Sequence, residues 1–345
     1  MSMNTPWEWI PDPKPWCKLV AGAVRDWRPS PFLKLSVDEF RAGIYRASEE
    51  GADWLLHPCM SRLTQAAPAA PARDLILAAW VAGHTGCDGE AELGSPFGLW
   101  SAAGDSAMPA GRCALRALGA VMVQGGPSRP ALDLWCRSTG IVTAGSWASL
   151  DDTAFSPLKP ELMRSIHRFL ALMTALEQAT PALLAWILAA TRVVRPLVPV
   201  AGYARSSHDP EVPGLIEVDL SSGPTQTIEL IAHETAHLHL RAAQAAVPLV
   251  DPGHTATYRS PLRPEPRPLM GILLAYHALA YICAALRQAA RAAVLAPESA
   301  ARALDDLARR RDDARTTMDA ARPHLTAAGA QFLDRTHKVA DHVFA

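Results

Sequence analysis

The sequence predicts a mainly α-helical protein with a small β element, an α+β fold. Apolar residues recur at helical spacing in most segments after residue 160. The clearest strand is GLIEVDLSS, residues 214–222, where successive side chains alternate between two faces. The next stretch, IELIAHETAHLHL at residues 228–240, has the pattern of a helix interior with two histidines four positions apart. We therefore expect a metal site between this helix and a later apolar helix.

The N-terminal half mixes Ala-rich helical stretches, such as ARDLILAAWVAG, with breaks rich in Gly, Pro and Ser. We assign residues 1–155 to an N-terminal helical region, for which we expect a role in peptide recognition, and residues 156–345 to an HExxH metal-binding catalytic region. ELMRSIHRFLALMTALEQA predicts a helix with one broad buried face. Pro181 begins the next helix, which we expect to end near Pro196.

The elements after the strand are helical. SSGPTQ makes the turn, and Thr225 or Thr227 is expected to cap the helix that follows. A Pro-rich loop at residues 248–268 leads to the strongly apolar helix LMGILLAYHALAYICAAL. The tail predicts two amphipathic helices separated near Pro323.

Composition narrows the functional classes. The chain has 345 residues, of which 49% are hydrophobic, and a formal net charge of -1, so it gives no electrostatic case for binding nucleic acid or an anionic membrane. Its 6 cysteines include no CxxC pair, which indicates a reducing compartment. The N-terminus lacks the apolar core of a signal peptide, and the longest candidate span, residues 181–190, is too short to cross a bilayer. We expect a cytoplasmic protein.

The HExxH stretch, residues 233–237, contains the candidate metal ligands. His233 and His237 leave the same face of a helix and can bind one metal ion, with Glu234 beside them. The alternative is a hydrogen-bonded core cluster, in which each buried polar group needs a partner. His239 lies two positions beyond His237 and points to another side of the helix, so we expect it at the surface or next to the ligands.

The third ligand distinguishes the possible chemistries. Leu240 stands where the HExxHxxGxxH peptidases have glycine, which excludes that class. Other peptidases take a Glu from a later helix, but residues 269–286 contain neither Asp nor Glu. The metal-competent side chain there is His277, which we expect to be the third ligand, with Asp251 and Glu265 as the next candidates.

The loop before that helix, YRSPLRPEPRPLMG, contains two arginines braced by prolines. Arg263 and Arg267 lie four positions apart, near Tyr258 and Ser260. Arginine suits two-point binding of a carboxylate, and proline leaves such a loop little entropy to lose. These four residues are therefore candidates for binding a carboxylate cosubstrate. The alternative is that the arginines tie the loop to surface carboxylates.

Four stretches together, ARSSHDPEVPGLIEVDL, LIAHETAHLHL, VPLVD and YRSPLRPEPRPLMGILLAYHAL, resemble the HExxH-type 2-oxoglutarate-dependent peptide β-hydroxylases. These are bacterial iron enzymes that modify ribosomally made peptides. The resemblance covers roughly residues 160–290 and implies that His233 and His237 are iron ligands. Many relatives place His or Gln a few residues after the RPLxG glycine, where this chain has Leu274; His277, three residues later, lies on nearly the same helical face.

The resemblance implies an Fe(II)- and 2-oxoglutarate-dependent dioxygenase, an oxidoreductase that hydroxylates the Cβ of a residue in a ribosomal precursor peptide. Glu234 would then orient water or a ligand. Two alternatives stay open. One is a zinc-dependent metallopeptidase in which Glu234 is the general base. The other is a degenerate homologue that binds a peptide or partner protein without catalysis.

Overall fold

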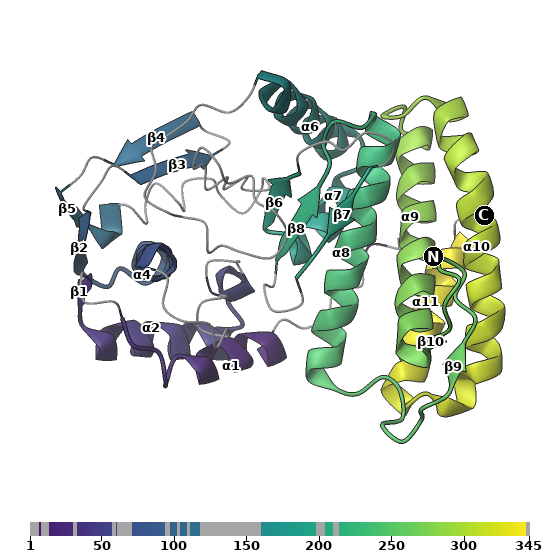
Figure 1. Cartoon of the computed structure of the whole chain (residues 1–345), viewed down its shortest axis with the longest axis horizontal. Helices are drawn as coiled ribbons and strands as arrows, with labels where there is room; N and C mark the ends of the chain where they lie inside the picture. Colours follow the sequence, from purple (N-terminus) through teal and green to yellow (C-terminus); the bar gives the residue numbers. More distant parts are fainter. Residues whose placement is uncertain are drawn as a thin grey trace, which may run out of the picture.

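The structure is a computed structural model that describes residues 7, 14–29, 33–56, 60, 71–93, 97–101, 104–108, 111–117, 160–197, 204–209 and 214–342. It is mainly helical with small sheets, which confirms the predicted fold class (Figure 1). The buried apolar side chains of these residues form two clusters. One is built from residues 17–115, and the other from Trp7 together with residues 169–340.

The N-terminal elements include strands that the sequence did not predict. In chain order they are α1 (Lys14–Ala23), β1 (Leu33–Leu35), α2 (Val37–Glu50), the 3-10 helix η1 (Asp53–Leu56), α4 (Pro71–Thr85), β2 (Gly89–Leu93), β3 (Phe97–Ser101), β4 (Gly104–Met108) and β5 (Gly111–Ala114). β1, β2 and β5 form an antiparallel sheet, and β3 pairs with β4 as a separate hairpin. The sequence predicted helical stretches in this region, which include α1, α2 and α4, but it did not reveal the strands, because strands this short show no clear alternation.

The C-terminal elements follow the expected order. They are α6 (Pro160–Ala179), α7 (Pro181–Ala190), β6 (Val193–Pro196), β7 (Ser206–Ser207), β8 (Leu215–Val218), α8 (Pro224–Ala246), β9 (Thr257–Tyr258), β10 (Arg267–Pro268), α9 (Leu269–Arg291), α10 (Pro297–Ala321), the 3-10 helix η4 (Arg322–His324) and α11 (Ala327–His342). The helix that begins at Pro181 ends earlier than predicted, because residues 193–196 form β6 parallel to β8.

β8 is the central strand of a small sheet and is buried along its whole length, with β6 on one side and antiparallel β7 on the other. Its alternating pattern therefore does not separate a solvent face from a core face. Glu217 and Asp219 are both buried. Glu217 pairs with Arg195 of β6 and accepts a hydrogen bond from Ser207 of β7, so the carboxylate has the partners that burial demands.

α8 lies between this sheet and α9 (Figure 1). Its N-cap is Gly223, with Pro224 in the first turn, so the predicted threonine caps were wrong. Thr225 instead shares a hydrogen bond with Ser299 of α10, and the Thr227 hydroxyl donates to the Ser222 carbonyl. Because both flanks of α8 are packed, the HExxH side chains sit in a largely buried setting.

α9 is the longest apolar segment in the described part of the chain, longer than the predicted candidate at residues 181–190. By length and composition it could cross a membrane, but 83% of its most apolar window is buried inside the molecule. Its neighbours are α8, α10 and α11 (Figure 1). α9 thus has the surroundings of a core helix, and its hydropathy alone gives no reason to place it in a bilayer.

The loop from Pro248 to Asp251 is joined to the start of α11. Leu249 O accepts the backbone N–H of Thr326, and the Thr326 hydroxyl donates to Pro248 O while accepting the N–H of Gly329. Thr326 therefore caps α11 and anchors the loop with the same hydroxyl. This attachment fixes the segment that leads into the β9–β10 hairpin.

Candidate metal centre

Glu234 lies at the centre of the HExxH site, with three imidazole rings around its carboxylate. His208 Nδ1 is 2.7 Å from Oε2, His237 Nδ1 is 3.9 Å from Oε2, and His233 Nε2 is 3.9 Å from Oε1. The ring centroids of His233 and His237 are 4.3 Å apart, which confirms that the four-residue spacing brings both rings to one face of α8. The side chain of His233 is the most exposed of the four, at 29%.

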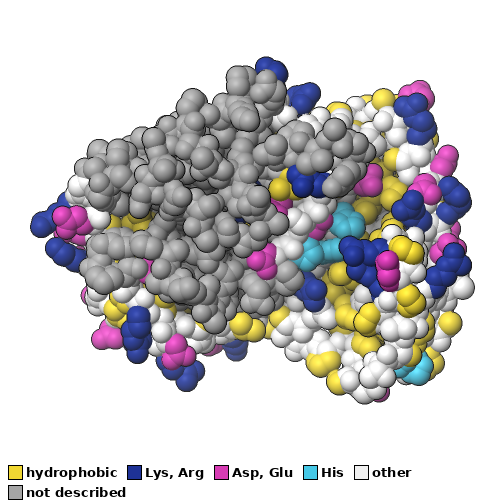
Figure 2. All heavy atoms as spheres, viewed as in Figure 1, with side chains coloured by type: hydrophobic (Ala, Val, Ile, Leu, Met, Phe, Trp, Pro, Cys, Tyr) yellow, Lys and Arg dark blue, Asp and Glu magenta, His cyan; other side chains and the backbone are white. Residues whose placement is uncertain are grey.

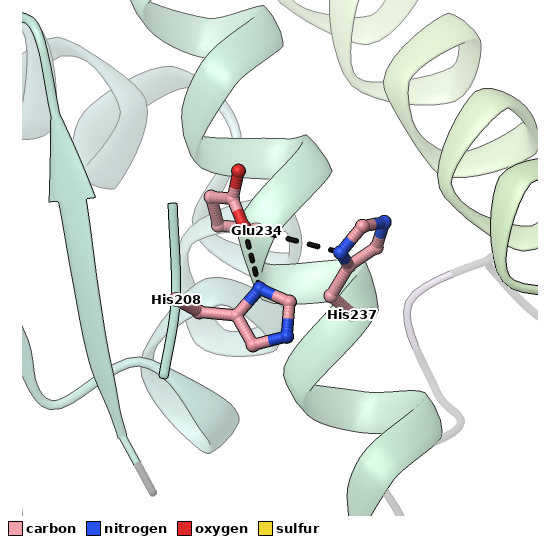
Figure 3. Close-up of side chains that lie close together, drawn as sticks. All are labelled: His208, Glu234 and His237. Atoms are coloured by element: carbon pink, nitrogen blue, oxygen red, sulfur yellow. Dashed lines mark hydrogen bonds and ion pairs between the residues drawn. The ribbon is translucent and has the colours of Figure 1, made fainter. Parts of the chain in front are cut away.

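His208 reaches the site from the sheet. It directly follows β7, and Figure 3 shows its ring beside the Glu234 carboxylate, next to His237. Ser206 of β7, two residues before His208, donates its hydroxyl to Glu234 Oε1 at 2.6 Å. Both carboxylate oxygens of Glu234 are therefore engaged by residues of one short segment, which joins β7 to α8.

Burial favours the neutral form of His233 and His237 beside an ionised Glu234. Burial lowers the pKa of His233 and His237, and the nearby His208 lowers both further. Burial alone would raise the pKa of Glu234, but the hydrogen bonds from His208 and Ser206 and the neighbouring His233 outweigh it, so the carboxyl pKa lies below its ordinary value. Neutral imidazole nitrogens beside a carboxylate are the protonation states that a divalent metal ion requires.

The donor atoms are close enough for one ion. One atom from each of His208, Glu234 and His237 lies within 4.8 Å of the others. Two nitrogens bound to one ion are at most about 4.2 Å apart, twice the metal–nitrogen bond length, so the group has to contract slightly on binding. Among the described residues, the buried Nδ1 of His237 has no hydrogen-bond partner. A buried imidazole nitrogen without a hydrogen-bond partner is expected at a metal site, and is not expected in a core cluster in which every polar group is hydrogen-bonded.

The structure does not bring the predicted third ligand, His277, into this group. His277 is buried in α9, where its Nδ1 lies 3.0 Å from the Thr336 hydroxyl of α11 and its ring packs against Tyr281 and Phe332. Its ligation therefore stays a prediction without support from the geometry. The other two candidates, Asp251 and Glu265, are exposed residues of the loop between α8 and α9.

His239 is fully buried, so the expectation that it lies at the surface was wrong. Its Nε2 hydrogen-bonds with the Trp186 carbonyl at 2.9 Å, and its ring stacks on the Trp186 indole. Burial lowers the pKa of His239 to about 4. It joins α8 to α7 as a neutral core residue.

The arginine loop forms the β9–β10 hairpin at the start of α9. Tyr258 and Arg267 face each other across the two strands. Ser260 is buried, and its hydroxyl accepts the backbone N–H of Arg263, so it shapes the turn. Arg263 is exposed, whereas Arg267 is half-buried and its side chain lies over Gly271 in the first turn of α9.

Tyr258 is held by its own contact, because its hydroxyl hydrogen-bonds with His254 at 2.9 Å. Of the predicted cofactor-binding residues, Arg267 is the one whose aliphatic side chain is held by packing while its guanidinium group carries a positive charge. Figure 2 shows histidine side chains reaching the surface with Lys and Arg side chains gathered beside them. These Lys and Arg side chains would attract an anionic ligand, although Asp and Glu side chains also lie next to the histidines (Figure 2).

His208 is the residue that sequence reasoning missed. It stands in SSHD, inside a stretch that belongs to the family resemblance, 25 positions before His233. The two-residue strand just before it shows no periodic pattern, so the position of His208 beside α8 comes from tertiary structure. Comparison with known proteins adds nothing here: no protein-family model matches the chain, and no curated protein matches it.

Proposed function

We propose that the protein is an Fe(II)- and 2-oxoglutarate-dependent oxygenase that hydroxylates the Cβ of a residue in a ribosomally made peptide. The observation that carries this proposal is the state of Glu234. A zinc peptidase needs this carboxylate to take a proton from metal-bound water. Here Ser206 and His208 occupy its two oxygens, and its side chain is only 4% exposed. The HExxH carboxylate is thus held in place by both neighbours, and its lowered pKa makes it a weaker general base for the hydrolytic mechanism.

His233 and His237 would hold the iron through imidazole nitrogens that burial keeps neutral. Neutral ligands leave the double positive charge of the ion uncompensated, which favours binding of a dianionic cosubstrate. When bound, the iron would supply the oxidative chemistry that couples decarboxylation of 2-oxoglutarate to hydroxylation of the peptide. The partly exposed ring of His233 leaves this side of the site open to ligands.

Arg267 is the residue we propose to bind the distal carboxylate of 2-oxoglutarate. Its backbone is fixed by pairing with Tyr258, and the aliphatic part of its side chain packs over Gly271. A guanidinium held this way loses little entropy when it binds a carboxylate in two-point geometry. Arg263 is exposed on the turn and would contribute less. A zinc peptidase has no 2-oxo acid cosubstrate, so it would not need an arginine in this position to bind a carboxylate.

The proposal is tested by turnover with defined metals. Protein reconstituted with Fe(II) should convert 2-oxoglutarate to succinate in air, and the reaction should stop without O2 or with zinc in place of iron. With a precursor peptide as substrate, mass spectrometry should show a gain of one oxygen atom. Peptide fragments formed by zinc-loaded protein, with no succinate under any condition, would instead establish a metallopeptidase. Bound metal and bound peptide with neither product would instead support a non-catalytic peptide-binding homologue.

A further inference from the structure

We propose that His208 supplies the third metal-binding nitrogen through Nε2, and that Glu234 is the positioning residue that fixes its ring. The proposal relies on the proposed function only for the presence of a divalent metal ion, because the same donor set would serve oxidative or hydrolytic chemistry. It replaces His277 as third ligand with a residue on the opposite side of α8.

Hydrogen bonding determines which nitrogen of His208 is available. An ionised carboxylate only accepts hydrogen bonds, so the 2.7 Å contact with Glu234 Oε2 requires the proton of His208 to be on Nδ1. A neutral imidazole carries one N–H, which leaves the lone pair on Nε2. The Ser206 hydroxyl donates a hydrogen bond to the other carboxylate oxygen of Glu234, Oε1. A carboxylate that holds the distal N–H of a histidine is the usual partner of a metal-binding imidazole.

The rings also form one contiguous group. The His208 ring lies 5.0 Å from the His237 ring at 82°, and His237 lies 4.3 Å from His233. Figure 3 shows His208 and His237 on two sides of the Glu234 carboxylate, which comes from the same helix as His237. His208 therefore adds a donor from the sheet to two donors from α8, so that the ion would join the two elements.

His277 fits the role less well. The Thr336 hydroxyl donates to the Phe332 carbonyl, so it can only accept from His277, which places the His277 proton on Nδ1 as well. The ring is nevertheless packed between Tyr281 and Phe332 inside the helical core. His277, like His233, is not in the group formed by His208, Glu234 and His237 among the described residues, so it is the packing of the His277 ring in the helical core that argues against ligation. Its hydrogen bond joins α9 to α11 instead.

Metal titrations of the full chain test the assignment without 2-oxoglutarate or O2. Affinity for Co²⁺ is measured by calorimetry and by the visible spectrum of the bound ion. His208→Ala should weaken binding by more than about 100-fold, beyond the range of a residue that only orients a ligand. Glu234→Ala should weaken it by about 10- to 100-fold, because the ring of His208 is released. Glu234→Gln should cost less than about tenfold, since an amide oxygen still accepts from Nδ1.

His254→Ala is the matched control, because it removes a histidine that hydrogen-bonds with Tyr258 and is not part of the His208–Glu234–His237 group. It should bind Co²⁺ with wild-type affinity. Wild-type affinity in His208→Ala would overturn the assignment of the third ligand. A loss in Glu234→Gln as large as that in His208→Ala would also overturn it, because the carboxylate would then be a ligand itself.

A second readout does not depend on how well the variants fold. In the metal-free wild-type protein, ¹⁵N-labelled histidine should show His208 with its proton on Nδ1, and Co²⁺ should broaden its Nε2 resonance most strongly. A proton on Nε2 in the metal-free protein would contradict the proposal. The succinate assay reports on the oxygenase chemistry alone, so a protein that binds metal through His208 but makes no succinate would refute the proposed function and leave this assignment intact.

Discussion

Replacing Gly329 with alanine should destabilise the C-terminal core, because this glycine lies directly against the backbone of the loop before the β9–β10 hairpin. A Cβ at this position would be 1.8 Å from the Leu249 carbonyl oxygen and 2.8 Å from its carbon. Both distances are below the 3.0 Å that Cβ atoms respect in proteins. The obstacle is main chain, which cannot rotate away, so the loop and α11 must separate by about 1 Å.

The separation breaks the hydrogen bonds between the loop and the start of α11. These run from the Thr326 backbone and hydroxyl to Leu249 O and Pro248 O, and from the Asp251 N–H to His324 O. At about 1 kcal/mol each, their loss costs about 3 kcal/mol. Alanine returns up to about 1 kcal/mol as the better helix former. The free energy of unfolding should therefore fall by about 2 kcal/mol.

Urea denaturation followed by circular dichroism measures the change, with an unchanged slope showing that only stability has moved. Gly253→Ala is the control in the same loop, since the nearest atom to its added Cβ is Asp251 Oδ1 at an ordinary 3.5 Å. It should change stability by less than about 0.5 kcal/mol. If Gly329→Ala is as stable as the control, the loop does not pack on α11 as described.

Three further predictions concern the site and its surroundings. Arg267→Ala should raise the apparent KM for 2-oxoglutarate about a hundredfold, because it removes a desolvated charge pair that contributes about 3 kcal/mol. Arg263→Ala should raise it far less. Equal effects of the two substitutions in steady-state kinetics would show that Arg267 is not the residue that binds the distal carboxylate. Metal-free protein should lose stability as pH falls from 6.5 towards 4, because the unfolded chain takes up a proton at His239 that the folded chain, with a pKa of about 4, does not. His239 alone accounts for about 3 kcal/mol of this loss below pH 4, and the lowered pKa values of His233 and His237 add to it; urea midpoints that stay flat over this range would contradict the prediction. Metal at a hundred times its Kd should stabilise the fold by about 2.7 kcal/mol, so chelation that leaves the thermal midpoint unmoved would argue against a metal site.

The long helices were predictable because each repeats its apolar pattern over several turns. α6 and α9 begin within one residue of the expected positions, α8 begins two to four residues earlier than expected, and the tail divides near Pro323 as predicted. The strands were not predictable in the same way. β7 has two residues and β1 has three, too few for a period of two to show. Their existence depends on the neighbours that pair with them.

The residues of the candidate site also differ in how far the sequence could predict their positions. His233 and His237 are four positions apart on one helix, so local geometry alone places their rings together. His208 joins them only because β7 pairs with β8 and Glu234 holds it, contacts between segments far apart in the chain. The lone histidine of an apolar helix, His277, looked like the missing donor, but a hydroxyl of α11 gives it a structural partner. A sequence pattern shows which residues can bind a metal and leaves open which of them meet.

The most direct test of the central claim is the visible absorption spectrum of the anaerobic protein with Fe(II), recorded before and after 2-oxoglutarate is added. Chelation of the iron by a 2-oxo acid produces a metal-to-ligand charge-transfer band that neither component shows alone. We expect this band to appear in the wild-type protein and to require a higher 2-oxoglutarate concentration in Arg267→Ala. A spectrum that does not change at saturating 2-oxoglutarate, in protein shown to contain iron, would contradict the assignment of this protein as a 2-oxoglutarate-dependent oxygenase.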